Sequence, residues 1–182
     1  LNFLQRLSGI ATATHHLASL ISHTRARLLD TRKTTPTLRT LEKKAVVDGG
    51  GCNHRFGLYD MVLIKDTHVD AAGGVGAALQ RVRSCLQGRP GIRIEVEVRT
   101  DKELQEAVEQ RPDRIMLDNM GVDRTARCVA YVRSEAPGIE IEASGGISAG
   151  TIAAIAQTGV DFISCGALTH SAPALDIHLI IG

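Results

Sequence analysis

Short β-rich runs alternate with helical stretches along almost the whole chain, and this alternation limits the possible folds more than any other feature. Six strands are predicted, at residues 26–30, 61–64, 92–98, 114–117, 139–143 and 162–165. Strands separated by single helical stretches predict a parallel sheet with right-handed crossovers. Two architectures then remain, a β/α barrel and an open doubly wound sheet.

The ends of the predicted strands favour the barrel. Five strands end beside a charged or hydroxyl residue and the sixth ends at Gly166; the residues at the five ends are Arg32 with Lys33, Lys65, Glu97, Asp118 and Ser144. Barrel enzymes collect such groups from many strand ends at one rim, whereas an open sheet binds its ligand at one switch point. We therefore predict an α/β fold, an incomplete TIM-like β/α barrel of six or seven strands.

The predicted barrel domain spans residues 1–175. It begins with an amphipathic helix over residues 1–21 that Gly9 interrupts. Residues 38, 41 and 45 form the predicted apolar face of the helix after Thr35-Pro36, where these two residues provide a cap and a first-turn proline. Residues 176–182 are predicted as a terminal strand with no helix after it.

Charge and composition exclude several functional classes. Lys and Arg number 21 against 20 Asp and Glu, so no excess of positive charge is present to hold nucleic acid or an anionic membrane. The apolar stretches fall far short of the roughly 20 residues that a membrane-spanning helix needs. Four widely spaced cysteines form no Cys-x-x-Cys pair, which argues against a zinc knuckle or a disulfide framework. Reduced, mostly buried thiols and a cytoplasmic location are expected.

Two cationic loops and one strand-end lysine are candidate anion-binding groups. Arg32 and Lys33 lie between threonines just past a strand, where a solvated loop is an equally good interpretation. His54 and Arg55 follow three consecutive glycines, more than a helix needs in order to stop. Lys65 ends a wholly apolar strand, a costly position for a cation without a function.

Glu97 and Asp118 end successive strands, so their carboxylates are predicted to converge. Such a pair can bind ribose hydroxyls, ligate Mg²⁺ or stabilise a developing cation, although ion pairing with nearby lysines explains the spacing equally well. Ser144 and Gly145 lead into a helix expected near residue 148, and Gly166 closes the next strand with His170 after it. Glycines at late strand ends beside a helix N-terminus predict a phosphate site. These groups together indicate an enzyme acting on a phosphorylated, anionic small molecule.

Seven segments of the chain, in order, resemble quinolinate phosphoribosyltransferase, also called nicotinate-nucleotide pyrophosphorylase (carboxylating): LNFLQRLSGIAT, LLDTRKTTP, GGGCNHRFGLYDMVLIKD, IEVEV, IMLDNM, EASGGI and CGALTHS. The resemblance covers essentially the whole chain. It implies a type II phosphoribosyltransferase barrel and a pentosyltransferase activity of de novo NAD biosynthesis. The implied reaction transfers a phosphoribosyl group from phosphoribosyl pyrophosphate to quinolinate with Mg²⁺, giving nicotinate mononucleotide, pyrophosphate and CO₂.

The resemblance also implies a role for each matching residue. The quinolinate-binding residues would be Thr31, Arg32, His54, Arg55 and Lys65. The residues near phosphoribosyl pyrophosphate would be Lys33, Glu97, Asp118, Ser144, Gly145, Gly166 and His170. Among all of these, Lys65, Glu97 and Asp118 would be catalytic, and Glu97 and Asp118 would also hold the metal.

Members of this family carry a further N-terminal α/β domain and a substrate-binding arginine just ahead of the motif that begins at Leu1. In the family that arginine serves the partner subunit of a homodimer, and the segment matching residues 176–181 joins the sheet of the further domain. We therefore expect the chain alone to bind quinolinate weakly. Two alternatives are a paralogue of the same fold that uses another substrate and a non-catalytic domain that binds a phosphorylated metabolite.

Overall fold

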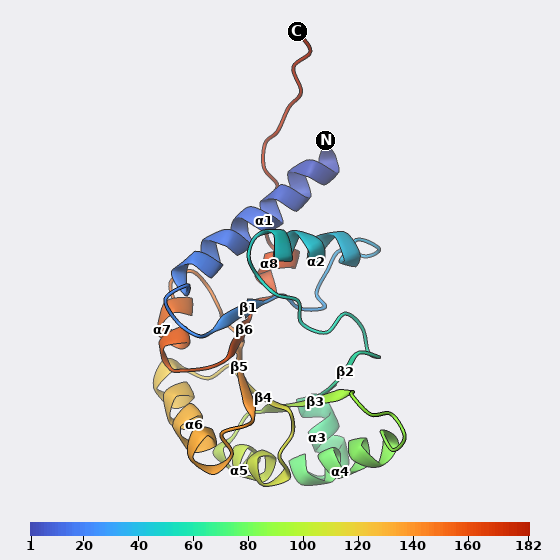
Figure 1. Cartoon of the computed structure of the whole chain (residues 1–182), viewed down its shortest axis with the longest axis vertical. Coiled ribbons are helices and arrows are strands. Elements are labelled where there is room, and N and C mark those ends of the chain that lie inside the picture. Colours follow the sequence, from blue (N-terminus) through green and yellow to red (C-terminus); the bar gives the residue numbers. More distant parts are fainter.

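The computed structural model describes all residues from Leu1 to Gly182, and its centre is one parallel sheet of six strands. The strands lie in the order β1, β6, β5, β4, β3, β2, and they follow an arc that stays open between β1 and β2 (Figure 1). The strand bounds are β1 Arg27–Leu29, β2 Met61–Ile64, β3 Arg93–Val98, β4 Arg114–Asp118, β5 Glu140–Ser144 and β6 Phe162–Ser164. The predicted α/β fold with an incomplete parallel barrel is therefore confirmed as an open sheet, and of the six or seven strands predicted six are present.

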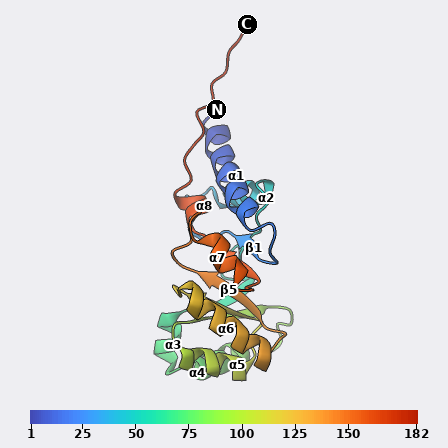
Figure 2. The ribbon, with the colours of Figure 1, turned by 90° about the vertical axis from the view of Figure 1, so that its left-hand side faces the viewer.

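Eight helices surround this arc on its convex side and at one end (Figures 1 and 2). Their bounds are α1 Asn2–Leu20, α2 Arg39–Asp48, α3 Asp66–Ala72, α4 Val75–Cys85, α5 Asp101–Gln110, α6 Val122–Glu135, α7 Ile152–Gln157 and α8 Ala167–His170. Helix α1 lies across the end of the sheet near β1 and packs mainly on α2. Because all six strands are parallel, their carboxyl ends lie on one side of the molecule.

The two faces of the sheet differ in chemistry because side chains alternate along each strand. The face toward the helices is aliphatic, with Val96, Ile115 and Ile141 each 0% exposed in the main hydrophobic core. The concave face instead carries acidic and basic side chains, since Glu95 pairs in register with Arg114 of the next strand. Most barrels fill this space with branched apolar residues. This barrel has its apolar core outside the sheet and a polar interior.

Three predictions about where helices begin or break are wrong. Helix α2 begins at Arg39, because Thr35 donates its backbone N–H and its hydroxyl to Glu42 at 3.0 and 2.7 Å and so does not cap the helix. Helix α7 begins at Ile152 rather than near residue 148. Helix α1 is continuous through Gly9, where a Cβ would lie 1.9 Å from the backbone oxygen of Pro173. Gly9 therefore serves close packing of the C-terminal segment.

Residues 172–182 form neither a helix nor a strand, so the strand predicted at 176–182 is absent from this sheet. Leu179, Ile180 and Ile181 are exposed, and the segment extends away from the body beyond α1 (Figure 1). A strand needs a neighbouring strand to satisfy its backbone groups, and no edge of the sheet lies beside this segment. Pairing with a sheet of another domain stays a prediction.

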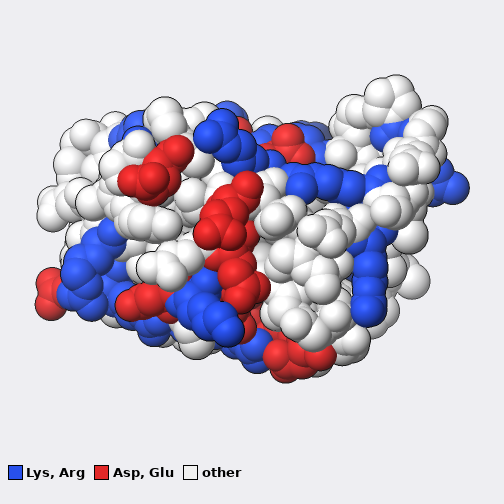
Figure 3. All heavy atoms as spheres, turned by 90° about the horizontal axis from the view of Figure 1, so that it is seen from below, with Lys and Arg blue, Asp and Glu red and all other residues white.

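The surface and the cysteines agree with most of the compositional predictions. Basic and acidic side chains are interspersed on the face seen from below in the view of Figure 1, where α4 and α5 lie (Figure 3), as the net charge of +1 suggests. No helix combines the length and the apolar character needed to cross a membrane. All four cysteines are free, but only Cys128 and Cys165 are buried, so the prediction of mostly buried thiols is half right.

Candidate active site

A cleft of about 830 Å³ opens at the carboxyl ends of the strands, and every residue proposed for the site from the sequence lines it. Those residues are Thr31, Arg32, Lys33, His54, Arg55, Lys65, Glu97, Asp118, Ser144, Gly145, Gly166 and His170. They come from the carboxyl ends of all six strands and from the loop that precedes β2. The barrel thus brings together groups that lie far apart in the sequence.

Four cations of the cleft have no carboxylate partner within the chain. None of the ion pairs of the structure includes Arg32, Lys33, Arg55 or Lys65. Most other buried or half-buried basic side chains do form ion pairs. The Nε atom of Arg32 is buried without a hydrogen-bond partner. Burial, and after it the charge of Arg32, lowers the pKa of Arg55. An anion in the cleft would relieve both the repulsion and the missing hydrogen bond.

Glu97 and Asp118 form an acidic couple on neighbouring strands of the same cleft. Glu97 is buried, and burial together with the negative charge of Asp118 raises its pKa. Neither carboxylate has an ion-pair partner, and Asp118 accepts only a hydrogen bond of 3.0 Å from the Asn119 side chain. Two carboxylates with free oxygens are hard donors that suit Mg²⁺. The donor set therefore fits a magnesium ion.

The loop after β5 has the backbone shape of an anion seat. Gly145 and Gly146 have φ values of +91° and +61°, which are costly for residues with a side chain. Their backbone N–H groups donate no hydrogen bond within the chain. At Gly145 a Cβ would also lie 2.2 Å from Oδ1 of Asn119. Successive free N–H groups in a turn of this kind bind phosphate or another anion.

Gly166 brings Lys33 and His170 to the neighbouring part of the cleft. A Cβ at Gly166 would lie 3.1 Å from Nε2 of His170 and 3.3 Å from Cδ of Lys33. Thr169 donates its hydroxyl to the backbone oxygen of Lys33 at 2.7 Å, which ties α8 to the first cationic loop. Lys33 and His170 are therefore close to the glycine-lined loops, as the sequence predicted for a phosphate site.

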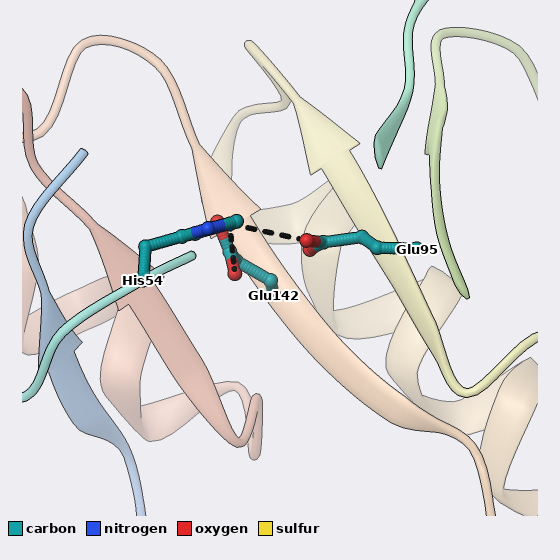
Figure 4. A group of neighbouring side chains, drawn as sticks. All are labelled: His54, Glu95 and Glu142. Carbon is teal, nitrogen blue, oxygen red and sulfur yellow. Dashed lines mark ion pairs between the residues drawn. The ribbon is translucent and has the colours of Figure 1, made fainter. Parts of the chain in front are cut away.

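Beneath the cleft lies a buried polar floor that consists of His54, Glu95, Arg114 and Glu142. Nε2 of His54 lies 3.1 Å from Glu95 Oε2 and 3.5 Å from Glu142 Oε2 (Figure 4), although neither contact is aligned as a hydrogen bond. Arg114 donates to Glu142 Oε2 at 3.0 Å and lies over the Phe162 ring at 3.9 Å. Burial raises the pKa of Glu95, and it raises that of Glu142 to about 8.

An imidazole and two carboxylates at these distances also resemble a metal site, but two contacts argue against one. The backbone N–H of Arg55 donates to Nδ1 of His54 at 2.7 Å, so a neutral ring carries its proton on Nε2, the nitrogen that faces the carboxylates. Burial lowers the pKa of His54, which favours this neutral ring. Arg114 already supplies a positive charge to Glu142. The floor is therefore an internal network of the protein.

Sequence patterns predicted His54 as a site residue and an inward-facing Glu95, but they did not indicate the buried contacts of the floor or the supports of the cationic loops. Lys43 on α2 is 1% exposed and Asp30 is 0% exposed, and their charged atoms are 2.5 Å apart. Burial lowers the pKa of Lys43 and raises that of Asp30, and their mutual hydrogen bond opposes both effects. The predicted apolar face of α2 was right at Ala45, which is buried, and wrong at Leu41, which is exposed, while Glu42 and Lys43 are buried. The apolar residues Ala45 and Val46 could have indicated that Lys43 is buried, since Lys43 lies three residues before Val46 and therefore on the same face of the helix.

Residues 10–180 match the family model described as "Quinolinate phosphoribosyl transferase, C-terminal domain". The chain is 48% identical to quinolinate phosphoribosyltransferase [decarboxylating] 2, mitochondrial, of Nicotiana glauca, with 98% of this chain and 54% of that protein covered. It is 44% identical to a probable nicotinate-nucleotide pyrophosphorylase [carboxylating] of Bacillus subtilis, with 98% and 60% covered.

Solved structures show the same likeness. The nicotinate-nucleotide pyrophosphorylase of Francisella tularensis superposes with a TM-score of 0.89 at 44% identity, over 97% of this chain and 61% of that one. The chain thus spans a little over half the length of the proteins that it matches.

Proposed function

We propose that this chain, which belongs to the quinolinate phosphoribosyltransferase family, provides the transfer site of a nicotinate-nucleotide pyrophosphorylase (carboxylating). The proposed reaction joins quinolinate to the ribose of phosphoribosyl pyrophosphate and releases pyrophosphate and CO₂. The product, nicotinate mononucleotide, is a precursor of NAD. One observation carries the proposal: a single cleft holds four cations without carboxylate partners, an acidic couple and a glycine-lined anion seat.

The proposed quinolinate end of the cleft contains Arg32, Arg55 and Lys65, assisted by Thr31. Quinolinate carries two carboxylates, and guanidinium groups bind carboxylates through two parallel hydrogen bonds. The unpartnered Nε of Arg32 supports this assignment. His54 also lines the cleft, but its ring nitrogens contact Arg55 and Glu95, so its proposed contribution is to the wall of the pocket.

The proposed phosphoribosyl end contains Lys33, Ser144, Gly145, Gly166 and His170. The free N–H groups of the loop after β5 would hold the 5-phosphate, and Lys33 would lie near the pyrophosphate. When the pyrophosphate leaves, positive charge develops on the anomeric carbon and its ring oxygen. The Glu97 and Asp118 carboxylates would bind the ribose hydroxyls and stabilise that charge, and Lys65 would assist at the reacting centre.

The same two carboxylates would hold Mg²⁺, and the bound ion would neutralise negative charge on the pyrophosphate. The cations around the ring would then keep it in place while one carboxylate is lost as CO₂. A homodimer and a cytoplasmic location also belong to the proposal. Exposed apolar side chains at the start of α1, namely Leu1, Phe3 and Leu4, support a contact with a further subunit or domain.

Calorimetric titration of the purified chain tests the proposal directly. Quinolinate, and separately phosphoribosyl pyrophosphate with Mg²⁺, should each bind, quinolinate weakly. Arg32→Gln should abolish quinolinate binding, because it removes the guanidinium at the carboxyl end of β1 and leaves only the Lys33 ammonium there. Arg25→Gln is the matched control, since Arg25 precedes β1 at the opposite end and pairs with Asp161 at 2.7 Å. Equal quinolinate affinity of the two variants would contradict the assignment.

A further inference from the structure

One face of helix α2 reaches both cationic loops of the cleft. Arg39 and Lys43 are four residues apart and therefore project on the same side of the helix. Arg39 donates to the backbone oxygens of Arg32 and Phe56, each at 3.1 Å. The loop that carries Arg32 and the loop that carries Arg55 are thus both attached to α2.

The deepest of these attachments is a clamp formed by Asp30 and Lys43. Nζ of Lys43 donates to Asp30 Oδ1 at 2.5 Å and to the backbone oxygen of His54 at 3.0 Å. Asp30 Oδ1 also accepts the backbone N–H of His54 at 2.8 Å. The pair therefore binds both backbone polar groups of a single residue, which fixes His54 in position and in orientation.

Stability alone does not account for this arrangement. Burying a lysine and an aspartate costs several kcal/mol per ion, and apolar residues of similar volume are often at least as stabilising. The neighbouring positions Ala45 and Val46 are apolar and buried. The pair is instead placed where it controls two functional loops, because Asp30 stands two residues before Arg32 and His54 stands one residue before Arg55.

We infer that Asp30 and Lys43 are positioning residues that set the distance between the two guanidinium groups of the cleft. Neither side chain lines the cleft, so neither touches a ligand there. The inference rests on the proposed function, since it takes a dicarboxylate as the ligand that needs both guanidinium groups at a defined separation. A misplacement of about 1 Å in such a pair can cost on the order of a hundredfold.

Lys43→Met tests the inference, with Lys44→Met as its matched control. Lys44 is the next residue of the same helix and pairs with Asp48 at 2.7 Å on the surface. In Lys43→Met we expect hydrogen exchange of the His54 amide to accelerate at least about tenfold and the dissociation constant of quinolinate to rise by a similar factor. Affinity for phosphoribosyl pyrophosphate with Mg²⁺ should change less than about twofold, and Lys44→Met should leave all three quantities unchanged.

A second variant separates positioning from stability. Asp30→Leu combined with Lys43→Met buries no unpaired charge, so its melting temperature should rise above that of Lys43→Met, and it should stay below that of the wild type because the backbone N–H and oxygen of His54 lose their partners. Its quinolinate affinity should stay as low as that of Lys43→Met. Recovery of affinity together with the melting temperature would overturn the inference, as would failure of the double variant to fold.

Failure of the proposed function gives a different result. If the unaltered chain binds no quinolinate, the ligand assignment is wrong. The exchange rate of the His54 amide would still report on the clamp. An unchanged exchange rate in Lys43→Met would overturn the clamp, whatever the ligand.

Discussion

The cleft and the floor beneath it contain the same kinds of charged residue, and they differ in how those charges are paired. In the floor, Arg114 lies 3.0 Å from Glu142, and the His54 ring is directed at two carboxylates. In the cleft, Arg32 and Lys65 have no carboxylate partner. Charges paired inside the protein form structure, whereas charges left unpaired toward a cavity are available to a ligand. On the proposed function, the paired charges of the floor are structural and the unpaired charges of the cleft bind the substrates.

The largest expected effect is on the floor. Above pH 8, where Glu142 is ionised, Arg114→Met should lower the free energy of unfolding by about 3–5 kcal/mol, because it leaves buried carboxylates without their cation. Urea denaturation measures this change. Arg93→Met is the control, since the half-exposed Arg93 pairs with Glu140 at 2.6 Å and should contribute less than about 1 kcal/mol. Equal losses in the two variants would remove the distinction between buried and exposed pairs.

In the cleft, a charge change should affect activity and not stability. Asp118→Asn should reduce the rate of phosphoribosyl transfer about 10²–10³-fold, since it removes a carboxylate that stabilises the developing positive charge. Single-turnover kinetics with quinolinate and phosphoribosyl pyrophosphate measures the rate. The unfolding free energy should stay within about 0.5 kcal/mol of the wild-type value. Unchanged turnover would remove Asp118 from the mechanism and favour a domain that only binds its ligand.

The anion seat combines a structural demand with a functional one. Gly145→Ala should cost about 1–3 kcal/mol of stability, because φ is +91° and the new Cβ would meet Asn119. It should also weaken the binding of inorganic phosphate, which calorimetry can follow. Gly146→Ala is the matched control: its φ of +61° also strains an alanine, but nothing lies within 4 Å of its Cβ position, so its loss of stability should be smaller. A larger loss of stability in Gly146→Ala would contradict this account of the loop.

A further expected effect is a dependence of stability on pH that comes from the floor. The pKa of Glu142 is about 8 in the folded protein against an ordinary 4.5, so the folded state keeps a proton that the unfolded chain loses between these values. Stability should therefore fall as the pH rises from 5 to 8, by at most about 1.4 kcal/mol per pH unit.

Glu142→Gln should remove this decline, and the difference between the two stability curves is the quantity to measure. The lowered pKa of His54 acts in the opposite direction, since its buried neutral ring favours folding more as the pH rises through 6.5. The histidine is present in both proteins, although its own pKa responds to the charge of Glu142. We expect the difference between the two stability curves to grow as the pH rises, and Glu142→Gln to be the more stable protein at pH 8. Parallel curves would contradict the assignment.

The strands and the cleft residues could be predicted because their signals are local. The apolar run at residues 61–64 and the lysine that follows it define both a strand and its functional end. The parallel sheet then places all such ends on one side, so Glu97 and Asp118 could be grouped without coordinates. The barrel's opening between β1 and β2 agrees with the expectation of an incomplete barrel.

The sequence by itself therefore determined the order of the elements, the polar strand ends and the family to which they belong. Only the tertiary structure decided which charges neutralise one another: Lys43 lies within a helix, Arg114 opens a strand and Glu142 lies inside one, and nothing in their order along the chain indicates their partners. The physical reason is that desolvation and pairing depend on distances between segments far apart in the chain. Spacing along a strand reports only which face a side chain occupies.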